Sequence, residues 1–338
     1  MLRARRLPWD DVKVVIAGGS GQVGSVLARA LSARGDEVVV LSRGSGAAGH
    51  EWRLGAAAAR AVGWDGASLG AWAGELDGSD VLINLAGRSV DCRYNAANRR
   101  AIMDSRVHST RVLGEAIARA GSPPGTWLQA GTATIYAHSF DRPNDEHTGV
   151  LGGDERGVPD TWRFSIDVAK TWERTLDEAR TPATRRVKLR SAIMMSPDRG
   201  GAFDVLLGLV RRGLGGRAGD GRQYVSWIHH EDFVRAVCWL IEREDLDGPV
   251  NLAAPQPLPN ADFIRALRQA WGIRFGLPAT GWMLAVGAFA MRTETELIAK
   301  SRRVVPGRLL EHGFEFVQPA WPAAARNLCG DWRARREA

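Results

Sequence analysis

Cysteine, lysine and tyrosine are scarce in this chain of 338 residues. Its three cysteines, Cys92, Cys238 and Cys329, have neither zinc-site nor disulfide spacing, so we expect no metal, no disulfide framework and a reducing, cytoplasmic environment. The longest run without a charged residue covers 17 positions, 275–291. A helix that crosses a membrane needs roughly 20 apolar residues, so the sequence predicts no membrane segment. The basic N-terminal residues lead into Pro-Trp-Asp-Asp at 8–11, which is not typical of a secretory signal.

Basic residues outnumber acidic ones by 45 to 38, which gives a net charge of +7. Only four of the basic residues are lysines, and the arginines are spread along the chain, many of them beside acidic residues. A surface that binds nucleic acid gathers its basic residues on one face or in one run. We therefore expect no nucleic-acid partner and interpret the charge as solvated surface.

Short apolar segments alternate with amphipathic helical patterns. Strands are predicted at 12–17, 37–41, 60–64, 81–86, 126–130 and 186–194. Helical patterns are found at 23–31, 96–120, 164–176 and 233–241. Strands that alternate with helices form a parallel sheet covered on both faces. The sequence thus predicts an α/β protein with a Rossmann-type, doubly wound parallel sheet, and the small-residue segments 44–49 and 55–61 are interpreted as loops.

The pattern becomes irregular after Pro197, where glycines gather, and prolines separate short helices from Pro255 onward. This change predicts a second lobe. We expect the Rossmann-type domain to span 11–195 with 226–254 returning to it, and a smaller C-terminal substrate lobe to comprise 196–225 and 255–338.

A glycine-rich turn joins the first predicted strand to the first helix. Gly18, Gly21 and Gly24 allow a tight turn, a close approach of a pyrophosphate to the backbone, and close packing of helix on strand. The helix N-terminus, which includes Gln22 and Val23, offers N–H groups to the phosphates. A P-loop would need a lysine after the last glycine, and a nucleophile elbow would need another glycine in the turn, so neither fits. The motif indicates dinucleotide binding.

The end of the second predicted strand bears on the choice of cofactor. An acidic residue there would hold the ribose 2′-hydroxyl of NAD, whereas an arginine accommodates the 2′-phosphate of NADP. The chain has Ser42 and Arg43 at this place and no acidic residue between 38 and 50. The sequence therefore favours NADP(H) over NAD(H), although a solvated loop arginine is the alternative interpretation of Arg43.

These features resemble the extended short-chain dehydrogenase/reductase family, and more narrowly its atypical epimerase branch, the nucleoside-diphosphate-sugar epimerase-like proteins. The resemblance covers almost the whole chain. Beside the glycine loop it is carried by residues 85–87, 105–110, 132–136, 172–173, 189–190, 219–229, 248–251, 305–310 and 313–314. It implies a nicotinamide cofactor above the sheet and a C-terminal lobe that closes over a substrate.

The resemblance also implies roles for individual residues. Leu85, Ala86 and Gly87 would line the cofactor, and Asp65 would approach the adenine. Thr132 would take the place of the catalytic serine or threonine, where it could donate a hydrogen bond to a substrate carbonyl. The alternative for Thr132 is that it caps the end of its strand.

The chain departs from the family at the catalytic pair Tyr-x-x-x-Lys, in which the lysine lowers the pKa of the tyrosine. None of the four lysines has a tyrosine four residues before it. With Trp172-Glu173 as the anchor, the two positions are occupied by Ser165 and Ala169. A shift by one residue would bring Lys170 into the lysine position but Ile166 into the tyrosine position.

Other side chains must then supply the chemistry. Tyr136 could provide a phenol, or it could anchor its loop. Five polar or aromatic residues are predicted to bind substrate. Four of the five should lie where the two lobes meet, and the arginines among them offer a planar donor fork to anionic groups. The five are Glu146, Arg190, Arg222, Gln223 and Trp227. Their alternative roles are a surface acid for Glu146 and a hydrogen-bond network between the lobes for the others.

No metal is expected at His229, His230, Glu231 and Asp232, because neighbouring residues on a strand point to opposite faces. Asp232 is expected to cap the helix that follows. The sequence as a whole predicts an NADP(H)-dependent oxidoreductase or epimerase that acts by hydride transfer on a small polar or anionic substrate. The alternative is a non-catalytic NADP(H)-binding regulatory or scaffold protein. The sequence does not indicate an oligomeric state.

Overall fold

A computed structural model describes residues 12–44, 50–54, 57–280 and 296–337. Its centre is a sheet of eight strands in the order β11-β7-β6-β5-β1-β2-β4-β3. Their bounds are β1 Lys13–Ala17, β2 Glu37–Ser42, β3 His50–Leu54, β4 Ala57–Gly63, β5 Val81–Asn84, β6 Thr126–Thr132, β7 Arg185–Ser191 and β11 Gly248–Leu252. Every neighbouring pair is parallel except β3 with β4. The predicted doubly wound α/β fold is confirmed.

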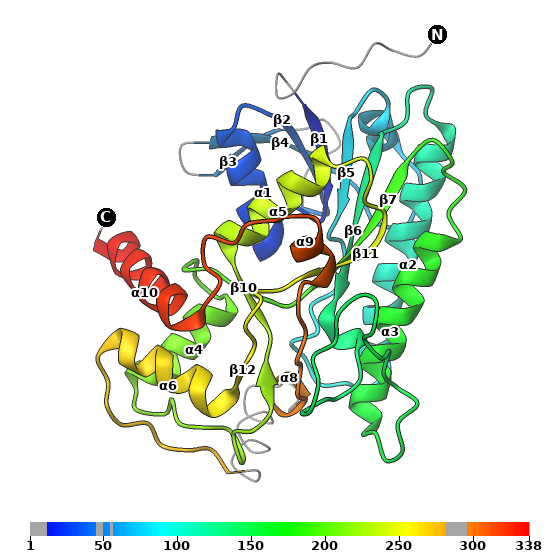
Figure 1. The fold of residues 1–338 in the computed structure, drawn as a ribbon. Coiled ribbons are helices and arrows are strands. Elements are labelled where there is room, and N and C mark those ends of the chain that lie inside the picture. Colours follow the sequence, from blue (N-terminus) through cyan, green and yellow to red (C-terminus); the bar gives the residue numbers. More distant parts are fainter. Residues whose placement is uncertain (1–11, 45–49, 55–56, 281–295, 338) are drawn as a thin grey trace.

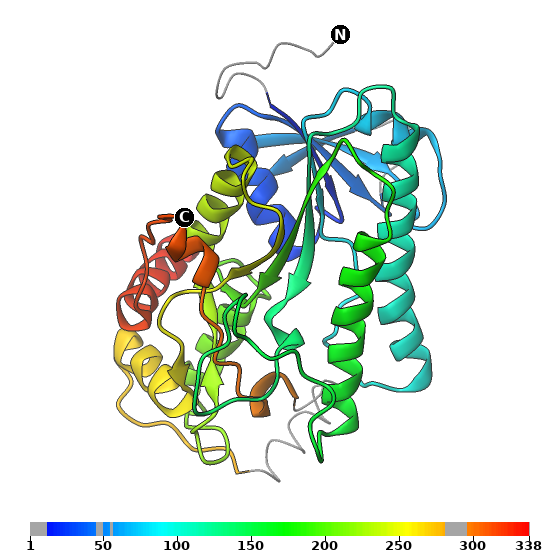
Figure 2. The same cartoon turned by 45° about the vertical axis from the view of Figure 1, so that its right-hand side comes forward.

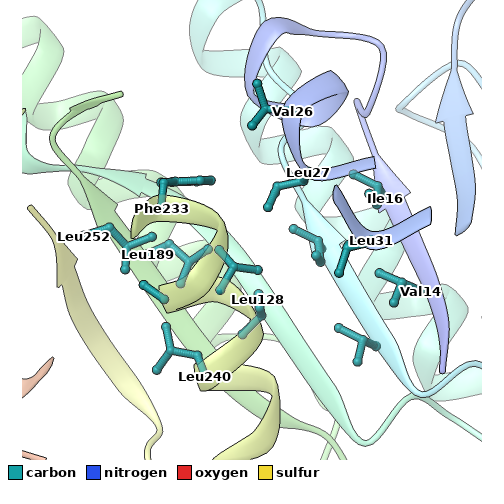
Figure 3. Packing of buried hydrophobic residues seen from close by; sticks show 14 of the residues in the cluster. Val14, Ile16, Val26, Leu27, Leu31, Leu128, Leu189, Phe233, Leu240 and Leu252 are labelled. Carbon is teal, nitrogen blue, oxygen red and sulfur yellow. The ribbon is translucent and has the colours of Figure 1, made fainter. Parts of the chain in front are cut away.

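Helices cover both faces of the sheet (Figure 1). The helices α1 Gln22–Ala33 and α5 His230–Glu242 lie on one face, and α2 Ala96–Arg119 and α3 Asp160–Asp177 lie on the other. Because side chains alternate along a strand, β1 sends Val14 and Ile16 toward α1 and Val15 and Ala17 toward α2. Figure 3 shows Leu27 and Leu31 of α1 and Phe233 and Leu240 of α5 packed on the strands of the first face.

A second, smaller lobe lies beside the carboxyl ends of the strands of the sheet (Figures 1 and 2). Its elements are β8 Ile193–Met195, α4 Ala202–Arg211, β9 Tyr224–Val225, β10 Trp227–His229, β12 Leu258–Pro259, α6 Asn260–Trp271 and α10 Trp321–Glu337. They share a core of their own that includes Phe203, Phe263 and Trp321. The chain returns to the main sheet at β11, which pairs with β7. The segment that carries α8 Glu296–Ala299 and α9 Gly307–Glu311 runs back across the first lobe.

Two expectations about the sheet are wrong. The segment 55–61 was expected to be a loop, yet Ala57–Gly63 forms β4 between β2 and β3. Alanines have no strong strand preference, so only the pairing with two neighbours makes this segment a strand. The predicted strand at 186–194 is divided: β7 ends at Ser191, and β8 pairs with β10 outside the main sheet. Of the other predicted loop, 45–49 lie outside the described residues.

Two short helical turns complete the elements that border the site, η1 Ala71–Leu76 and η2 Ala133–Ile135. Among the residues described, no helix is both long and apolar enough to span a membrane.

Candidate functional site

The candidate site lies at the carboxyl ends of the parallel strands. After β1 the chain moves to β2 on one side, and it later returns to β5 on the other side of β1. The loops after β1 and β5 therefore diverge, and ligands of open α/β sheets bind in the crevice that such a reversal leaves. Leu85 continues the ladder beyond β5, because its N–H donates to the carbonyl oxygen of Ala17 at 2.8 Å.

The three glycines of the turn differ in what a side chain at each position would meet. Gly18 has φ +75°, and a Cβ there would lie 2.8 Å from Cα of Ala86. A Cβ on Gly24 would lie 2.4 Å from Cα of Gly19, so helix α1 could not pack against the turn. At Gly21, by contrast, a Cβ would approach only the carbonyl oxygen of Gly18, at 3.5 Å. The fold itself does not require Gly21, whereas a pyrophosphate that lies against the backbone would.

No side chain caps the first N–H groups of helix α1. Gly21 is its N-cap, and no side chain forms a capping hydrogen bond there. Such a helix end carries unpaired donors and a positive partial charge, which suit a phosphate group. In this first turn Gln22 is exposed, and its amide lies against Gly201 of the second lobe. Val23 packs on the hydrophobic core that α1 and α5 form with the sheet. The turn therefore fits a dinucleotide phosphate.

The end of β2 is tied to the glycine turn. Gly18 N–H donates to the carbonyl oxygen of Leu41 at 3.0 Å, and the hydroxyls of Ser42 and Ser20 lie 3.1 Å apart. Arg43 follows with an exposed side chain. The predicted pair Ser42 and Arg43 thus lies next to the turn that would hold the phosphates.

A buried amide network holds the loop after β5, and the sequence interpretation missed it. Asn84 Oδ1 accepts the N–H of Ala86 at 3.0 Å, and Asn84 Nδ2 donates to Gln129 Oε1 at 3.0 Å. The same amide lies 3.4 Å from Thr110 Oγ1, which also accepts from Trp172 Nε1 at 3.1 Å. Polar residues inside buried strands were the available signal, since a buried amide needs partners.

The next residue of this loop, Gly87, is confined by a partly buried arginine. A Cβ on Gly87 would lie 3.1 Å from Cζ of Arg106. Arg106 donates to the carbonyl oxygens of Arg88 and Ile102 and lies over the ring of Trp172. Burial lowers the pKa of Arg106 to about 10. Leu85, Ala86 and Gly87 thus form a fixed loop opposite the glycine turn.

Asp65, predicted to approach the adenine, uses its carboxylate within its own turn. The carboxylate accepts from the hydroxyl and the N–H of Ser68 and from the N–H of Ala67 at 2.8 Å. These bonds, the Ser68 hydroxyl above all, lower the pKa of Asp65 to about 2. Its contact with a cofactor stays a prediction.

Thr132 ends β6 and is half-buried. Its Oγ1 accepts the N–H of Thr134 at 3.1 Å, so the capping role that the sequence left open is present. A threonine that accepts through its oxygen can still donate its own proton. Thr134 is held in turn by the C-terminal segment, because its carbonyl accepts from Lys300 Nζ at 2.7 Å and its hydroxyl from Arg302 Nε at 3.2 Å.

Tyr136 and Arg190 belong to one buried network. The Tyr136 hydroxyl donates to Asn251 Oδ1 at 2.9 Å and accepts from Arg190 Nη1 at 3.0 Å. Arg190 is 6% exposed and forms a two-pronged pair with Glu173 at 2.7 and 2.8 Å. Burial raises the pKa of Tyr136. The geometry favours the structural alternative for both residues, because their donors and acceptors are already paired with protein groups.

Three of the other predicted substrate residues are also engaged in packing. Glu146 is not a surface acid, since it accepts the N–H groups of Asn251 at 2.7 Å and Arg308 at 3.2 Å and its pKa is raised by burial. Gln223 donates to the carbonyl oxygen of Ala218 at 3.0 Å. Trp227 is fully buried against Trp321. Polar groups inside a fold can thus satisfy one another instead of a ligand, and the substrate roles of these residues stay predictions.

Arg222 alone of the five predicted substrate residues is exposed, above the ring of Phe140. The expected capping role of Asp232 is wrong. His229 caps α5 by accepting from Glu231 N–H, while Asp232 accepts from the N–H groups of Val317 and Gln318. In the part of the chain that the structure describes, no group of three His, Cys, Asp or Glu side chains is arranged to hold a metal.

The family is decided by comparison with known proteins. Residues 14–154 match the model of the NAD dependent epimerase/dehydratase family, and residues 279–328 match a domain of unknown function, DUF1731. The chain is 33% identical over 311 residues to the epimerase family protein Mb2239 of Mycobacterium bovis, with 90% of this chain and 93% of that protein covered. The chain belongs to the NAD-dependent epimerase/dehydratase family.

Mammalian members of this epimerase family match over nearly their full length. Identity to the epimerase family protein SDR39U1 of Bos taurus is 30% over 323 residues, which cover 94% of this chain and 99% of that protein. The crystal structure of the human SDR39U1 with NADPH superposes with a TM-score of 0.80 at 28% identity, covering 95% of this chain and 100% of the human one. The resemblance drawn from the sequence is confirmed.

The buried ion pair of Arg190 with Glu173 leads to a prediction about stability. Arg190→Ala leaves the Glu173 carboxylate buried without its partner, so the free energy of unfolding should fall by about 3–5 kcal/mol. Arg222→Ala removes an exposed side chain and should change it by no more than about 0.5 kcal/mol. Urea denaturation measures both. If Arg190→Ala unfolds at the wild-type urea concentration, the structural assignment of Arg190 is wrong.

Proposed function

We propose that this chain is an NADP(H)-dependent oxidoreductase or epimerase that transfers hydride to or from a small polar or anionic substrate. The observation that carries the proposal is the room at Gly21, where a Cβ would contact only the carbonyl oxygen of Gly18, at 3.5 Å. This space lies at the uncapped start of α1, opposite the loop fixed by Asn84. The NADPH bound to the human family member supports the same cofactor.

The preference for NADP(H) is argued from charge. Arg43 is exposed directly after β2, next to Ser42, which is bonded to the glycine turn. A guanidinium can donate two parallel hydrogen bonds to a phosphate, whereas a free 2′-hydroxyl gains little from it. The binding residues are proposed to be Gly18, Gly21, Gln22, Val23, Gly24, Ser42, Arg43, Asp65, Leu85, Ala86 and Gly87.

The residues at the end of β6 would orient the substrate. When bound, the nicotinamide accepts or donates a hydride. The Thr132 hydroxyl, which accepts from Thr134 N–H, is left to donate its proton to the oxygen of the reacting carbon. The charge of Arg222 suits a polar or anionic substrate.

A non-catalytic NADP(H)-binding protein is the second candidate. One prediction and one observation favour it: the sequence predicts Ala169 at the position of the family's lysine, and the Tyr136 phenol is held by Arg190 and Asn251. Screening the chain with NADPH against aldehydes, ketones and nucleotide sugars separates the candidates. Binding of NADPH without turnover of any of them supports the second.

The cofactor preference is tested at Arg43. Arg43→Ala removes charge-assisted hydrogen bonds that contribute about 1.5–3 kcal/mol, so NADPH should bind about 10–100-fold more weakly. NADH affinity should change by less than about twofold, because no phosphate is lost from the contact. Titrations that follow nicotinamide fluorescence give both constants. Equal losses for the two nucleotides would refute the role of Arg43.

The role of the Thr132 hydroxyl is tested with a pair of variants. Thr132→Val removes the donor and should lower kcat about 100–1,000-fold, the usual effect of losing one such hydrogen bond in a transition state. Thr132→Ser retains the hydroxyl and should retain most of the activity. NADPH affinity should be near the wild-type value in both. Full turnover by Thr132→Val would remove Thr132 from the mechanism.

A further inference from the structure

Side chains from three parts of the chain meet at Ser165 on α3, the residue that the sequence predicts at the position of the family's catalytic tyrosine. Its Oγ lies 3.3 Å from the hydroxyl of Tyr94. The same Oγ is hydrogen-bonded to Oε2 of Glu296 on α8. Tyr94 comes from the loop between β5 and α2, and its phenol hydroxyl lies beside the side chain of Ser165.

Hydrogen counting gives this chain of bonds a direction. A serine hydroxyl has one proton, and a carboxylate only accepts. Ser165 therefore donates to Glu296, and its oxygen can accept the proton of the Tyr94 hydroxyl, which lies 3.3 Å away. The Glu296 carboxylate is buried and lies 3.6 Å from the guanidinium of Arg302. The result is a proton path that runs from a phenol through a hydroxyl to a carboxylate.

The path is joined to the candidate site at both of its ends. At the carboxylate end, Lys300 follows Glu296 on the same segment, is 2% exposed, and donates to the Thr134 carbonyl beside Thr132. At the phenol end, Tyr94 lies in the loop that continues from Leu85–Gly87. The charge of Arg106, which confines Gly87, acts on the Tyr94 hydroxyl. Tyr94 thus contacts helix α3 and belongs to the loop that begins with the residues proposed to line the cofactor.

The path explains how a tyrosine could work here without a lysine. Burial raises the pKa of Tyr94, and the charge of Glu296 raises it further. A phenol whose pKa is raised in this way is a poor base at neutral pH. A phenol that passes its proton to Ser165 while it takes another from the substrate never becomes a tyrosinate, so its high pKa is no obstacle.

We propose that Tyr94 exchanges the proton that accompanies hydride transfer, with Ser165 and Glu296 as the positioning residues that carry it onward. This inference rests on the proposed function. In the oxidation direction the substrate O–H proton passes to Tyr94, the Tyr94 proton to Ser165, and the Ser165 proton to Glu296 Oε2. The O–H electron pair forms the C=O bond while the hydride leaves the same carbon for NADP⁺. Reduction runs through the same steps in reverse.

The first test needs no substrate. The chain has only three tyrosines, so isotope-labelled tyrosine gives three resonances by NMR, and Tyr94→Phe identifies one of them. The oxidised nicotinamide ring is positively charged and the reduced ring is neutral. The Tyr94 resonance should therefore differ between the NADP⁺ and NADPH complexes, while those of Tyr136 and Tyr224 stay unchanged. A Tyr94 resonance that is identical in the two complexes would overturn the proposal.

The second test uses turnover of a carbonyl that the wild-type chain reduces. Tyr94→Phe and Ser165→Ala should each lower kcat about 100-fold or more with little change in KM, because they remove a proton-transfer step. Ser165→Thr keeps the hydroxyl and should restore most of kcat, and Tyr224→Phe is the matched control. Full kcat in Tyr94→Phe would refute the path.

The two proposals fail in different ways. If NADPH does not bind to the wild-type chain, the proposed function itself is wrong. If NADPH binds and is turned over by the Tyr94→Phe variant at the wild-type rate, only the proton path is wrong. A loss of kcat in Tyr136→Phe but not in Tyr94→Phe would return the phenol to Tyr136.

Discussion

The geometry of the site depends on the buried side-chain amide of Asn84. It lies at the end of β5, and its two ends bind the backbone of the loop that follows and the side chain of Gln129 on β6. That loop lies against Gly18, where even a methyl group would collide with the backbone of Ala86. The two loops on either side of the strand reversal are therefore fixed relative to each other. A dinucleotide can bind across them because neither loop needs to be ordered by the ligand.

The sequence was sufficient to predict the sheet, the glycine turn and the family, because each of these has a local signature. Apolar runs that alternate with helical patterns require a covered parallel sheet, and glycines between a strand and a helix require a tight turn. The strand predicted at 60–64 captured only the second half of β4, because the alanine run in its first half has no strand signature. Its conformation follows from pairing with β2 and β3, which only the folded chain provides.

The candidate substrate residues could not be predicted in the same way. Arg190 and Glu146 have the chemistry of ligand-binding groups, but each is paired with a protein group that is distant in sequence. Ser165 is separated from Tyr94 by 71 positions and from Glu296 by 131, so no local motif connects the three. The absence of a Tyr-x-x-x-Lys sequence was visible in the chain, whereas the contact of Ser165 with Tyr94 and Glu296 was visible only in the structure.

The most direct test of the cofactor site is the affinity for NADPH of a Gly21→Val variant. Gly21 has φ −74° and ψ 172°, a conformation that valine adopts, and a Cβ there would make only an ordinary contact with the Gly18 carbonyl oxygen, at 3.5 Å. The variant should therefore fold with a Tm close to that of the wild type and lose NADPH binding, because the valine occupies the place of the pyrophosphate. A Gly21→Val variant that binds NADPH as tightly as the wild-type chain would contradict the proposed cofactor site.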